Sequence, residues 1–337
     1  MSKIKIAQIG TSKNSHGNFI WNSIKKQSDI FEICGYAMPE NEKEKFPEHF
    51  KAFEGYSELT VDEIMSNPEI EAVIIETEEI YLTKYAQMAA DNKKHIHMEK
   101  PGGTNLADFE KLIETVKKNK TVFHTGYMYR YNPYVVELIE KIKNGELGDI
   151  ISVEAQMNCI HPKETRQWLQ SFPGGMMFFL GCHLIDLICL IQGAPKRIIS
   201  LNKCSNVDGV TAEDFGMAVF EYENGISFAK TSAVEIGGFE RRQLVVSGTK
   251  KTVELKPLEW NVGEGNLVTE RFVRDSRDWS CFTEKETSGA FDRYDAMMRS
   301  FAEIVSGKKE NPYSYDYELE LYKTILKSCG GQENVLR

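Results

Sequence analysis

One lysine stands where a strand must end. Residues 94–98 alternate polar and apolar side chains, and Glu99-Lys100-Pro101 follows them. Proline lacks the N–H that a central strand needs, so the strand stops before it. Because ligands bind at the carboxyl ends of strands in open α/β sheets, the sequence predicts that Lys100 faces a ligand. Taken alone, the triplet also fits a solvated ion pair before a turn.

A histidine in an apolar stretch is the second candidate for chemistry. It follows Gly174-Gly175 in the segment that runs from Phe179 to Asp186. If this segment is helical from Phe179 onward, His183 and Asp186 share one face and Phe179 lies one turn earlier on it. Imidazole is well suited to accept a proton near neutral pH, although a hydrogen-bonded core histidine is the alternative for His183 alone.

The first third of the chain must position the lysine. It alternates strand-like and helix-like periods, a pattern typical of βαβ units and a parallel sheet. We therefore expect an α/β Rossmann-type dinucleotide-binding domain over residues 1–126. Its predicted strands are Ile4 to Ile9, Phe31 to Met38, Ala72 to Thr77, His95 to Met98 and Val122 to Tyr127.

Strands dominate the rest of the sequence. Short turns such as Glu223-Asn224-Gly225 predict antiparallel hairpins. We expect residues 127–337 to form an α+β domain with a large, mostly antiparallel open sheet. Its predicted strands are 150–158, 197–202, 216–222, 226–234, 242–247 and 251–255, and its predicted helices are 133–144, 291–306 and 315–328.

The turn after the first strand stands where a dinucleotide fingerprint belongs. The glycines of that fingerprint allow a tight turn and let pyrophosphate approach a helix N-terminus. Only the first glycine fits here, while serines occupy the later positions and can cap the helix or donate to phosphate. A turn without a ligand is the alternative. The candidate cofactor-binding residues are Gly10, Thr11, Ser12, Asn14 and Ser15.

An acid that binds the ribose hydroxyls is expected at the end of the second strand. Met38 occupies the equivalent position, and Glu40 lies close enough to serve if the loop folds back. NAD is slightly favoured as the cofactor, but Lys43 and Lys45 leave NADP open.

Composition restricts the partners. The chain has 337 residues, of which 50 are acidic and 41 basic, and its net charge of -9 disfavours nucleic acid and anionic membranes. Seven scattered cysteines, odd in number, indicate a reducing compartment. The N-terminal segment has no signal-peptide pattern, so we expect a cytoplasmic protein. The stretch Met176 to Ile191 is too short and too polar to span a bilayer.

Four ordered motifs resemble those of the Gfo/Idh/MocA oxidoreductases, and the resemblance covers nearly the whole chain. It implies an NAD- or NADP-binding N-terminal domain, with Thr77, Glu99 and Lys100 among the cofactor-binding residues. It also implies a C-terminal sheet that forms the substrate floor and the interface of a homodimer or homotetramer. The motifs are Glu99-Lys100-Pro101, Gly126 to Pro133, Gly145-Glu146-Leu147-Gly148, and Trp168 followed by Gly174-Gly175 and Gly181 to Asp186.

The resemblance implies that Lys100 orients a reacting hydroxyl and that His183 accepts its proton while hydride passes to the nicotinamide. Such an arrangement requires the two groups, from separate domains, to converge on one cleft. A lysine ammonium stabilises a developing alkoxide, which makes these roles physically reasonable. A carbohydrate is the expected substrate, and no metal is expected. Candidate substrate-binding residues are Met128, Tyr129, Asn158, His161, Arg166 and His183, with surface polarity as the alternative for Asn158, His161 and Arg166.

Two departures from the family pattern lie near the predicted centre. Many members have an aspartate four residues before the histidine, where this chain has Phe179. Relatives also commonly have a histidine at the position of Leu82. Phenylalanine cannot accept a hydrogen bond from an imidazole or a hydroxyl.

Three functions are therefore compared. The first is an NAD(P)-dependent oxidoreductase acting on a sugar, polyol or sugar derivative. The second is a glycoside-cleaving enzyme that oxidises the sugar transiently, eliminates the leaving group and returns the hydride, as some relatives do. The third is a nucleotide-sensing or scaffolding subunit without turnover; Phe179 and Leu82 favour it, whereas Lys100 and His183 oppose it.

Overall fold

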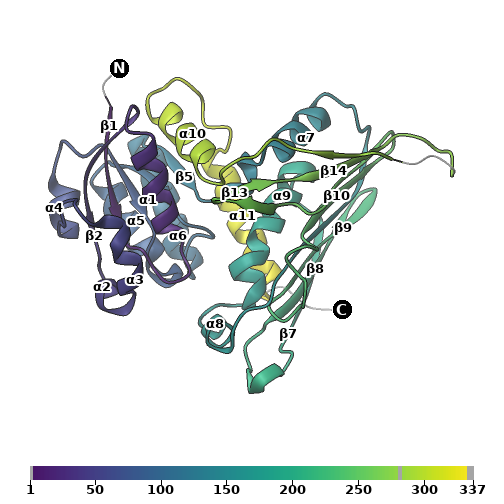
Figure 1. The fold of residues 1–337 in the computed structure, drawn as a ribbon, viewed down its shortest axis with the longest axis horizontal. Helices are drawn as coiled ribbons and strands as arrows, with labels where there is room; N and C mark the ends of the chain where they lie inside the picture. Colours follow the sequence, from purple (N-terminus) through teal and green to yellow (C-terminus); the bar gives the residue numbers. More distant parts are fainter. Residues whose placement is uncertain (1–2, 280–282, 332–337) are drawn as a thin grey trace. The chain divides into compact units, whose positions relative to one another are not determined.

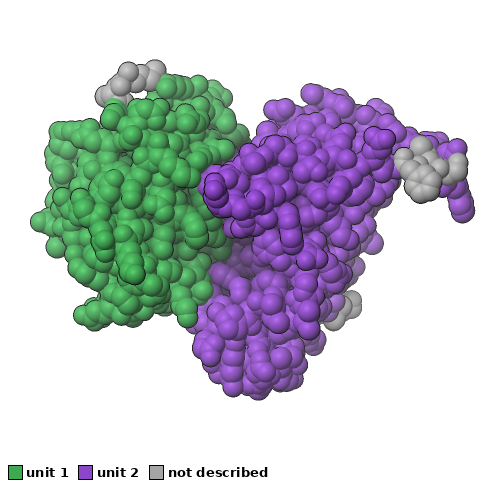
Figure 2. All heavy atoms as spheres, in the orientation of Figure 1, with its two compact units in different colours: residues 1–128, 294–322 green, residues 129–293, 323–337 purple. Residues whose placement is uncertain are grey.

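The computed structural model describes residues 3–279 and 283–331, which form two compact units (Figure 2). Among the described residues, the first unit contains residues 3–128 and 294–322, and the second contains residues 129–279, 283–293 and 323–331. The predicted boundary after residue 126 lies two residues before the change of unit at Met128. The sequence did not predict that residues 294–322 pack with the first unit.

The first unit has a five-stranded parallel sheet, as predicted. All four residues of its central strand Ala72–Ile75 are buried, which is typical of a parallel strand covered on both faces. In sheet order, the strands are β2 (Phe31–Ala37), β1 (Ile4–Ile9), β3 (Ala72–Ile75), β4 (His95–Met98) and β5 (Phe123–Thr125).

Helices cover this sheet (Figure 1). The Thr60 side chain accepts from the Glu63 N–H and the Glu63 side chain accepts from the Thr60 N–H, a capping box that fixes where α4 begins. The helices of the unit are α1 (Gly17–Lys26), α2 (Glu42–Lys45), α3 (Pro47–Phe50), α4 (Val61–Ser66), α5 (Leu82–Asp91), α6 (Leu106–Asn119) and α10 (Asp295–Val305), with 3-10 turns η1 (Lys51–Phe53) and η2 (Glu79–Tyr81).

Helix α10 belongs to the first unit although it lies far along the sequence. It packs against α1, where the Ser23 hydroxyl donates to Asp295 Oδ1 over 2.6 Å. The 3-10 turn η3 (Met128–Tyr131) contains the change of unit, and α11 (Tyr315–Ser328) is divided between the two units after Tyr322.

The second unit has an eight-stranded sheet in which only the β6–β9 pair is parallel. The predicted large, mostly antiparallel sheet is therefore confirmed. In sheet order, the strands are β15 (Lys285–Thr287), β14 (Glu270–Arg274), β11 (Thr252–Leu255), β10 (Gln243–Gly248), β6 (Ile150–Asn158), β9 (Gly225–Ser232), β8 (Phe215–Tyr222) and β7 (Arg197–Lys203); β12 (Trp260–Gly263) and β13 (Asn266–Val268) form a separate hairpin.

Helix α9 (Cys182–Gln192) packs on β6 and β9, on one face of the sheet (Figure 1). The inward residues of β6 alternate and include Val153, Ala155 and Met157, all fully buried. Besides α9, the helical segments of the second unit are α7 (Pro133–Lys143), α8 (Lys163–Trp168), η4 (Leu169–Ser171), the π-helical turn η5 (Met177–Gly181) and η6 (Val207–Gly209). In the part of the chain that the structure describes, no helix is both long and apolar enough to cross a membrane.

Candidate cofactor and active site

The strand predicted to deliver Lys100 ends where the sequence indicated. β4 stops at Met98, between β3 and β5, so Glu99 and Lys100 follow its carboxyl end. Both side chains are buried, at 1% and 2% exposed, and Lys100 Nζ lies 3.5 Å from Glu99 Oε1. The same oxygen accepts the Lys100 backbone N–H over 3.1 Å. The lysine is thus buried together with a counter-charge on the preceding residue.

Glu99 also contacts the loop between β1 and α1. Its other oxygen, Oε2, lies 3.1 Å from Nδ1 of His16, the residue that precedes α1. Burial alone would raise the pKa of Glu99, but the charges of His16 and Lys100 and the hydrogen bond with His16 bring it down to about 2. Glu99 is therefore a carboxylate between two bases.

Two further buried carboxyl groups lie within electrostatic range of Lys100. Glu76 and Glu79, after β3, are 0% and 1% exposed. Burial raises the pKa of Glu76 well above its usual value, with the charge of Glu99 adding to the effect, and burial raises the pKa of Glu79 to about 7. These acids supply protonatable groups at the strand ends that the sequence analysis did not select.

The turn after β1 requires its glycine. Gly10 has φ 85°, and a Cβ there would lie 2.6 Å from both Thr77 Cγ2 and the Thr77 backbone nitrogen. The Ser12 N–H donates to Glu76 O, whereas the buried Ser12 hydroxyl has no hydrogen-bond partner among the described residues. A buried hydroxyl without a partner beside the start of a helix fits a phosphate-bearing ligand. The predicted loop residues thus surround a turn that can accept a dinucleotide.

A different acid from the predicted one reaches this turn. Glu40 accepts from Lys84 Nζ and Tyr85 OH, both over 2.6 Å, and Met38 is half-buried. Glu42 is 1% exposed, and its Oε2 accepts the Thr11 N–H over 2.8 Å. Burial is the main reason why the pKa of Glu42 rises to about 7. Sequence reasoning missed Glu42 because it lies five residues beyond the strand.

In the second unit, His183 lies in the first turn of α9 and is 1% exposed. The Tyr129 ring meets its imidazole edge to face, with centroids 5.2 Å apart. The Tyr129 hydroxyl donates to Glu259 Oε1 over 2.6 Å. Burial, with the charge of Glu259, raises the pKa of Tyr129, so this hydroxyl stays protonated. Two predicted site residues, Tyr129 and His183, are therefore in contact.

The carboxylate of Glu259 is shared by two arginines. Arg242 Nη1 lies 2.7 Å and Arg293 Nη2 lies 2.6 Å from its Oε1. Burial opposes ionisation, but the charges of Arg293 and Arg242 hold the pKa of Glu259 below its usual value. The network fixes the Tyr129 ring against His183.

The segment before His183 is not the regular helix on which the face-sharing prediction depended. Met177–Gly181 forms a π-helical turn, which changes the angular spacing between Phe179 and His183. The Phe179 ring packs edge to face on Trp168, with ring centroids 5.1 Å apart, and its centroid lies 6.3 Å from that of the His161 ring. The aromatic side chain thus belongs to a cluster with α8.

The run from Gly126 to Pro133 has a structural purpose as well. Arg130 Nε donates to Asp186 Oδ2 over 2.9 Å, and both side chains are 1% exposed. Asn132 Oδ1 accepts from the Tyr134 and Val135 N–H groups and begins α7 together with Pro133. Asp186 therefore orients Arg130, and Met128 is buried at the start of this run.

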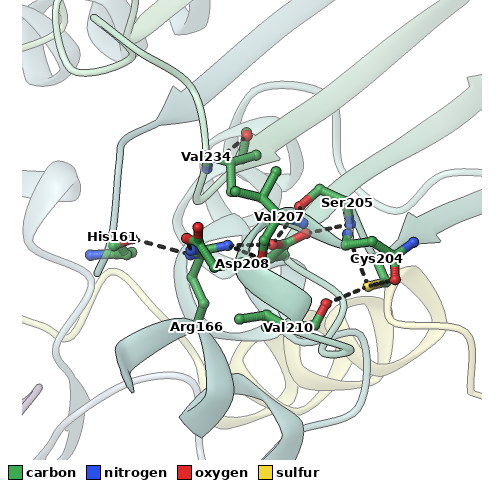
Figure 3. A network of polar contacts seen from close by, with 11 residues as sticks. His161, Arg166, Cys204, Ser205, Val207, Asp208, Val210 and Val234 are labelled. Carbon is green, nitrogen blue, oxygen red and sulfur yellow. Dashed lines mark hydrogen bonds and ion pairs between the residues drawn. The ribbon is translucent and has the colours of Figure 1, made fainter. Parts of the chain in front are cut away.

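Arg166 is fully engaged within the second unit, as Figure 3 shows. Its guanidinium donates to His161 O over 3.2 Å and to Val207 O over 2.9 Å, and it pairs with Asp208 and, at 3.5 Å, with Asp214. These contacts tie the loop after β6 to η6. A substrate role for Arg166 stays a prediction.

Asn158 and His161 lie at the end of β6 and just after it. Asn158 is 0% exposed, and neither polar atom of its side chain has a hydrogen-bond partner among the described residues. A Cβ at Gly238 would lie 2.9 Å from Asn158 Cβ, so residues of that loop cover it. Burial and the Arg242 charge lower the pKa of His161, which leaves its imidazole neutral.

The remaining histidines have structural partners. His97 Nδ1 lies 2.7 Å from His124 Nδ1 inside the first unit, and His95 Nδ1 accepts the Val122 N–H. Within residues 3–279 and 283–331, no group of three or more His, Cys, Asp or Glu side chains could hold a metal ion.

The fold and the loop after β1 define a dinucleotide-binding oxidoreductase architecture, and comparison with known proteins gives the family. Residues 4–127 match the oxidoreductase family described as having an NAD-binding Rossmann fold, and residues 135–254 match the GFO/IDH/MocA C-terminal domain. The chain belongs to the Gfo/Idh/MocA oxidoreductase family.

Individual relatives are distant. An uncharacterized oxidoreductase of Rhizobium meliloti is 24% identical over 205 residues, 60% of each chain. Myo-inositol 2-dehydrogenase of Thermotoga maritima is 31% identical over 195 residues, 56% of this chain and 57% of that protein. The chain thus spans about 60% of the length of these relatives.

A solved structure shows the same fold over nearly the full length. UDP-N-acetylglucosamine 3-dehydrogenase from Acidithiobacillus ferrooxidans superimposes with a TM-score of 0.77 and covers 98% of both chains, at 17% identity. At this identity the similarity concerns the fold.

The buried Glu79 predicts a pH dependence of stability. Its pKa of about 7 exceeds the ordinary 4.5, so the folded protein binds this proton more tightly than the unfolded chain does. Wild-type stability should therefore fall by roughly 3 kcal/mol between pH 4.5 and 7 through this group. In Glu79→Gln the decline measured by urea unfolding at pH 5 and pH 8 should be smaller by about this amount, because Glu42 and Glu76 still contribute to it. The exposed Glu44→Gln should retain it; equal slopes in all three proteins would contradict the prediction.

The buried Arg130–Asp186 ion pair predicts that removing one charge destabilises the protein more than removing both. Asp186→Ala leaves a buried guanidinium without its counter-charge and should lower the free energy of unfolding by about 3–5 kcal/mol. The double variant Arg130→Met/Asp186→Leu removes both charges and should recover most of this loss. Chemical denaturation of wild type, single and double variants measures the difference. A double variant as unstable as the single one would show that the pair acts through other contacts.

Proposed function

We propose that this protein is an NAD-dependent oxidoreductase that interconverts a secondary hydroxyl and a ketone on a sugar, polyol or sugar derivative, with Lys100 and His183 handling the hydroxyl proton. The observation that carries the proposal is the buried Lys100–Glu99 pair at the carboxyl end of β4. It lies in a unit whose sequence matches an NAD-binding Rossmann domain. The names of the inositol and UDP-sugar dehydrogenase relatives support the substrate class.

The residues of the first unit fit a dinucleotide. Gly10 allows the tight turn, the Ser12 hydroxyl is available to phosphate, and α1 begins just beyond the loop. Thr77 lies against Gly10 and completes the floor of the turn. When bound, the nicotinamide ring supplies the hydride acceptor or donor.

The protein side chains then control the proton and the orientation of the sugar. Lys100, paired with Glu99, holds the reacting oxygen by a hydrogen bond and takes the hydroxyl proton as the hydride leaves. His183, held by the Tyr129 ring, stands on the substrate side. Asn158 offers a buried amide for a sugar hydroxyl, because burial without a partner is otherwise unfavourable. A dimer or tetramer formed through the sheet of the second unit is part of the proposal.

Glu42 favours NAD over NADP. Its carboxylate reaches the turn after β1 from the segment that follows β2, where acids bind the ribose hydroxyls in dinucleotide-binding domains. Above about pH 7, where Glu42 is ionised, a second negative charge there opposes the 2′-phosphate of NADP. Lys84 and Tyr85 already bind Glu40, so this residue is less suited to the role.

Replacing Lys100 tests the chemistry. Lys100→Met should lower kcat/KM for sugar oxidation about 10³-fold, because the charge next to the reacting oxygen is lost, and should leave NAD affinity within a few-fold. The assay follows absorbance of the reduced cofactor over a carbohydrate panel. Lys94→Met is the matched control, since Lys94 is also buried but lies before the start of β4 and donates to Asn67 O and Ile70 O.

The same assay separates the other candidate functions. Release of an aglycone from a glycoside without net reduction of NAD would show the elimination chemistry instead. A non-catalytic subunit would be supported if no substrate on the panel were turned over and if nucleotide changed the assembly state of Lys100→Met as it does that of wild type. If neither NAD nor NADP bound at millimolar concentration, the proposal would be excluded altogether.

Replacing Glu42 tests the cofactor preference. Glu42→Gln keeps an acceptor for the Thr11 N–H but removes the charge, so the ratio of NADP to NAD affinity should rise about tenfold. Nucleotide titration followed by fluorescence gives both dissociation constants. Glu40→Gln should change the ratio little, and a wild type that binds NADP more tightly than NAD would contradict the assignment.

A further inference from the structure

A continuous line of ionisable groups connects Lys100 to the loop between β1 and α1. Lys100 Nζ lies 3.5 Å from Glu99 Oε1, and Glu99 Oε2 lies 3.1 Å from His16 Nδ1. All three residues belong to the first unit, so the line does not depend on the second one. Neither the sequence motifs nor the proposed function gives a role to His16.

Access to water differs along this line. Lys100 and Glu99 are 2% and 1% exposed, whereas the side chain of His16 is 21% exposed. The imidazole packs against the Tyr294 ring, with centroids 5.4 Å apart, and this contact orients it on the loop. Of the three groups, His16 is the one that can exchange a proton with solvent. His183, by contrast, is 1% exposed.

We propose that His16 is the proton outlet of the reaction, connected to Lys100 by the carboxylate of Glu99. The inference rests on the proposed oxidoreductase function, because it requires Lys100 to act on the substrate hydroxyl. A buried lysine that receives a proton at every turnover must pass one on, and Glu99 offers one oxygen to each base.

The proton and electron balance closes. Before the transfer, Lys100 is an ammonium, Glu99 is a carboxylate, and Nδ1 of His16 carries no proton. An ammonium proton moves from Lys100 to Glu99 Oε1, and the carboxyl group that results turns its O–H toward His16 Nδ1, which takes the proton. This leaves a neutral amine, a carboxylate and an imidazolium. The amine accepts the hydroxyl proton as the C–H electron pair leaves as hydride to the oxidised nicotinamide. His16 then releases its proton to water, and one proton has left per hydroxyl oxidised.

The surroundings support the carboxylate as the intermediate. The charges that act on Glu99 come from His16 on the loop, Lys100 beside it and His97 on β4. Glu76 and Glu79 face the same lysine from the segment after β3. Burial favours the protonated form of Glu76 and Glu79, so Glu99 is the base that remains between the lysine and the histidine.

His16→Asn isolates proton transfer from hydrogen bonding. The asparagine side chain can hydrogen-bond Glu99 in place of the imidazole, but it cannot carry a proton at neutral pH. Asparagine is also favoured at the residue that precedes a helix, and His16 precedes α1 without making a side-chain cap, so the variant should fold. His95→Asn is the matched control, because His95 accepts the Val122 N–H at the other end of the sheet.

With NAD and the panel sugar that wild type oxidises fastest, His16→Asn should lose about 10²-fold in kcat at pH 7. Added imidazole should restore at least tenfold of this loss, and NAD affinity should stay within twofold of wild type. Wild-type kcat in His16→Asn, or a loss that imidazole does not restore, would overturn the proposal. His95→Asn should match wild type in all three measurements.

A second measurement needs no turnover and so separates this inference from the proposed function. In a nitrogen NMR titration of the nucleotide-free protein from pH 5 to 11, the His16 imidazole signal should show an alkaline inflection as the Lys100 ammonium loses its proton. Both Lys100→Met and Glu99→Gln should lose that inflection. If wild type lacks it, the line is broken even where the oxidoreductase assay succeeds; if it is present without turnover, the coupling stands and the proposed substrate class fails.

Discussion

A lysine can be buried at the end of a strand only together with a negative charge. Lys100 is 2% exposed, and an uncompensated ammonium there would cost several kcal/mol. Glu99 removes this penalty, and its low pKa follows from His16 and Lys100 acting on it from two sides. The pair needs β4 to end at Met98, the loop after β1 to hold His16, and the sheet to place both loops at one edge. The architecture of the first unit can therefore be understood as support for one buried ion pair.

Most of the regular elements could be predicted because their periods are clear. The parallel strands are short apolar runs, and β6 was predicted with its observed ends, Ile150 and Asn158. The four strands between Trp260 and Thr287 were missed, since their residues are mostly exposed or half-buried and do not alternate regularly. Such strands form because neighbouring strands offer hydrogen bonds, a context that local sequence does not contain.

The candidate site was predictable where a residue follows directly from an element's end. Lys100 and Gly10 are such residues, and the structure places each after its strand. Glu42 was not predictable, because Glu40 and Asn41 both adopt positive φ, at 59°, and turn the chain back toward Thr11. No local sequence signal predicts that a glutamate will adopt the left-handed backbone conformation. Phe179 illustrates the same limit, since a π-helical turn changes which residues share a face.

The two units carry different chemistry. Around Lys100 the neighbours are ionisable, whereas His183 meets the ring of Tyr129, and Phe179 belongs to an aromatic cluster with Trp168. In the proposed relay, protons move along Glu99 and His16 whichever substrate is bound, whereas aromatic surfaces favour a substrate of a particular shape. A phenylalanine in place of the family aspartate thus alters the polarity of the second unit and leaves the ionisable line of the first unit intact.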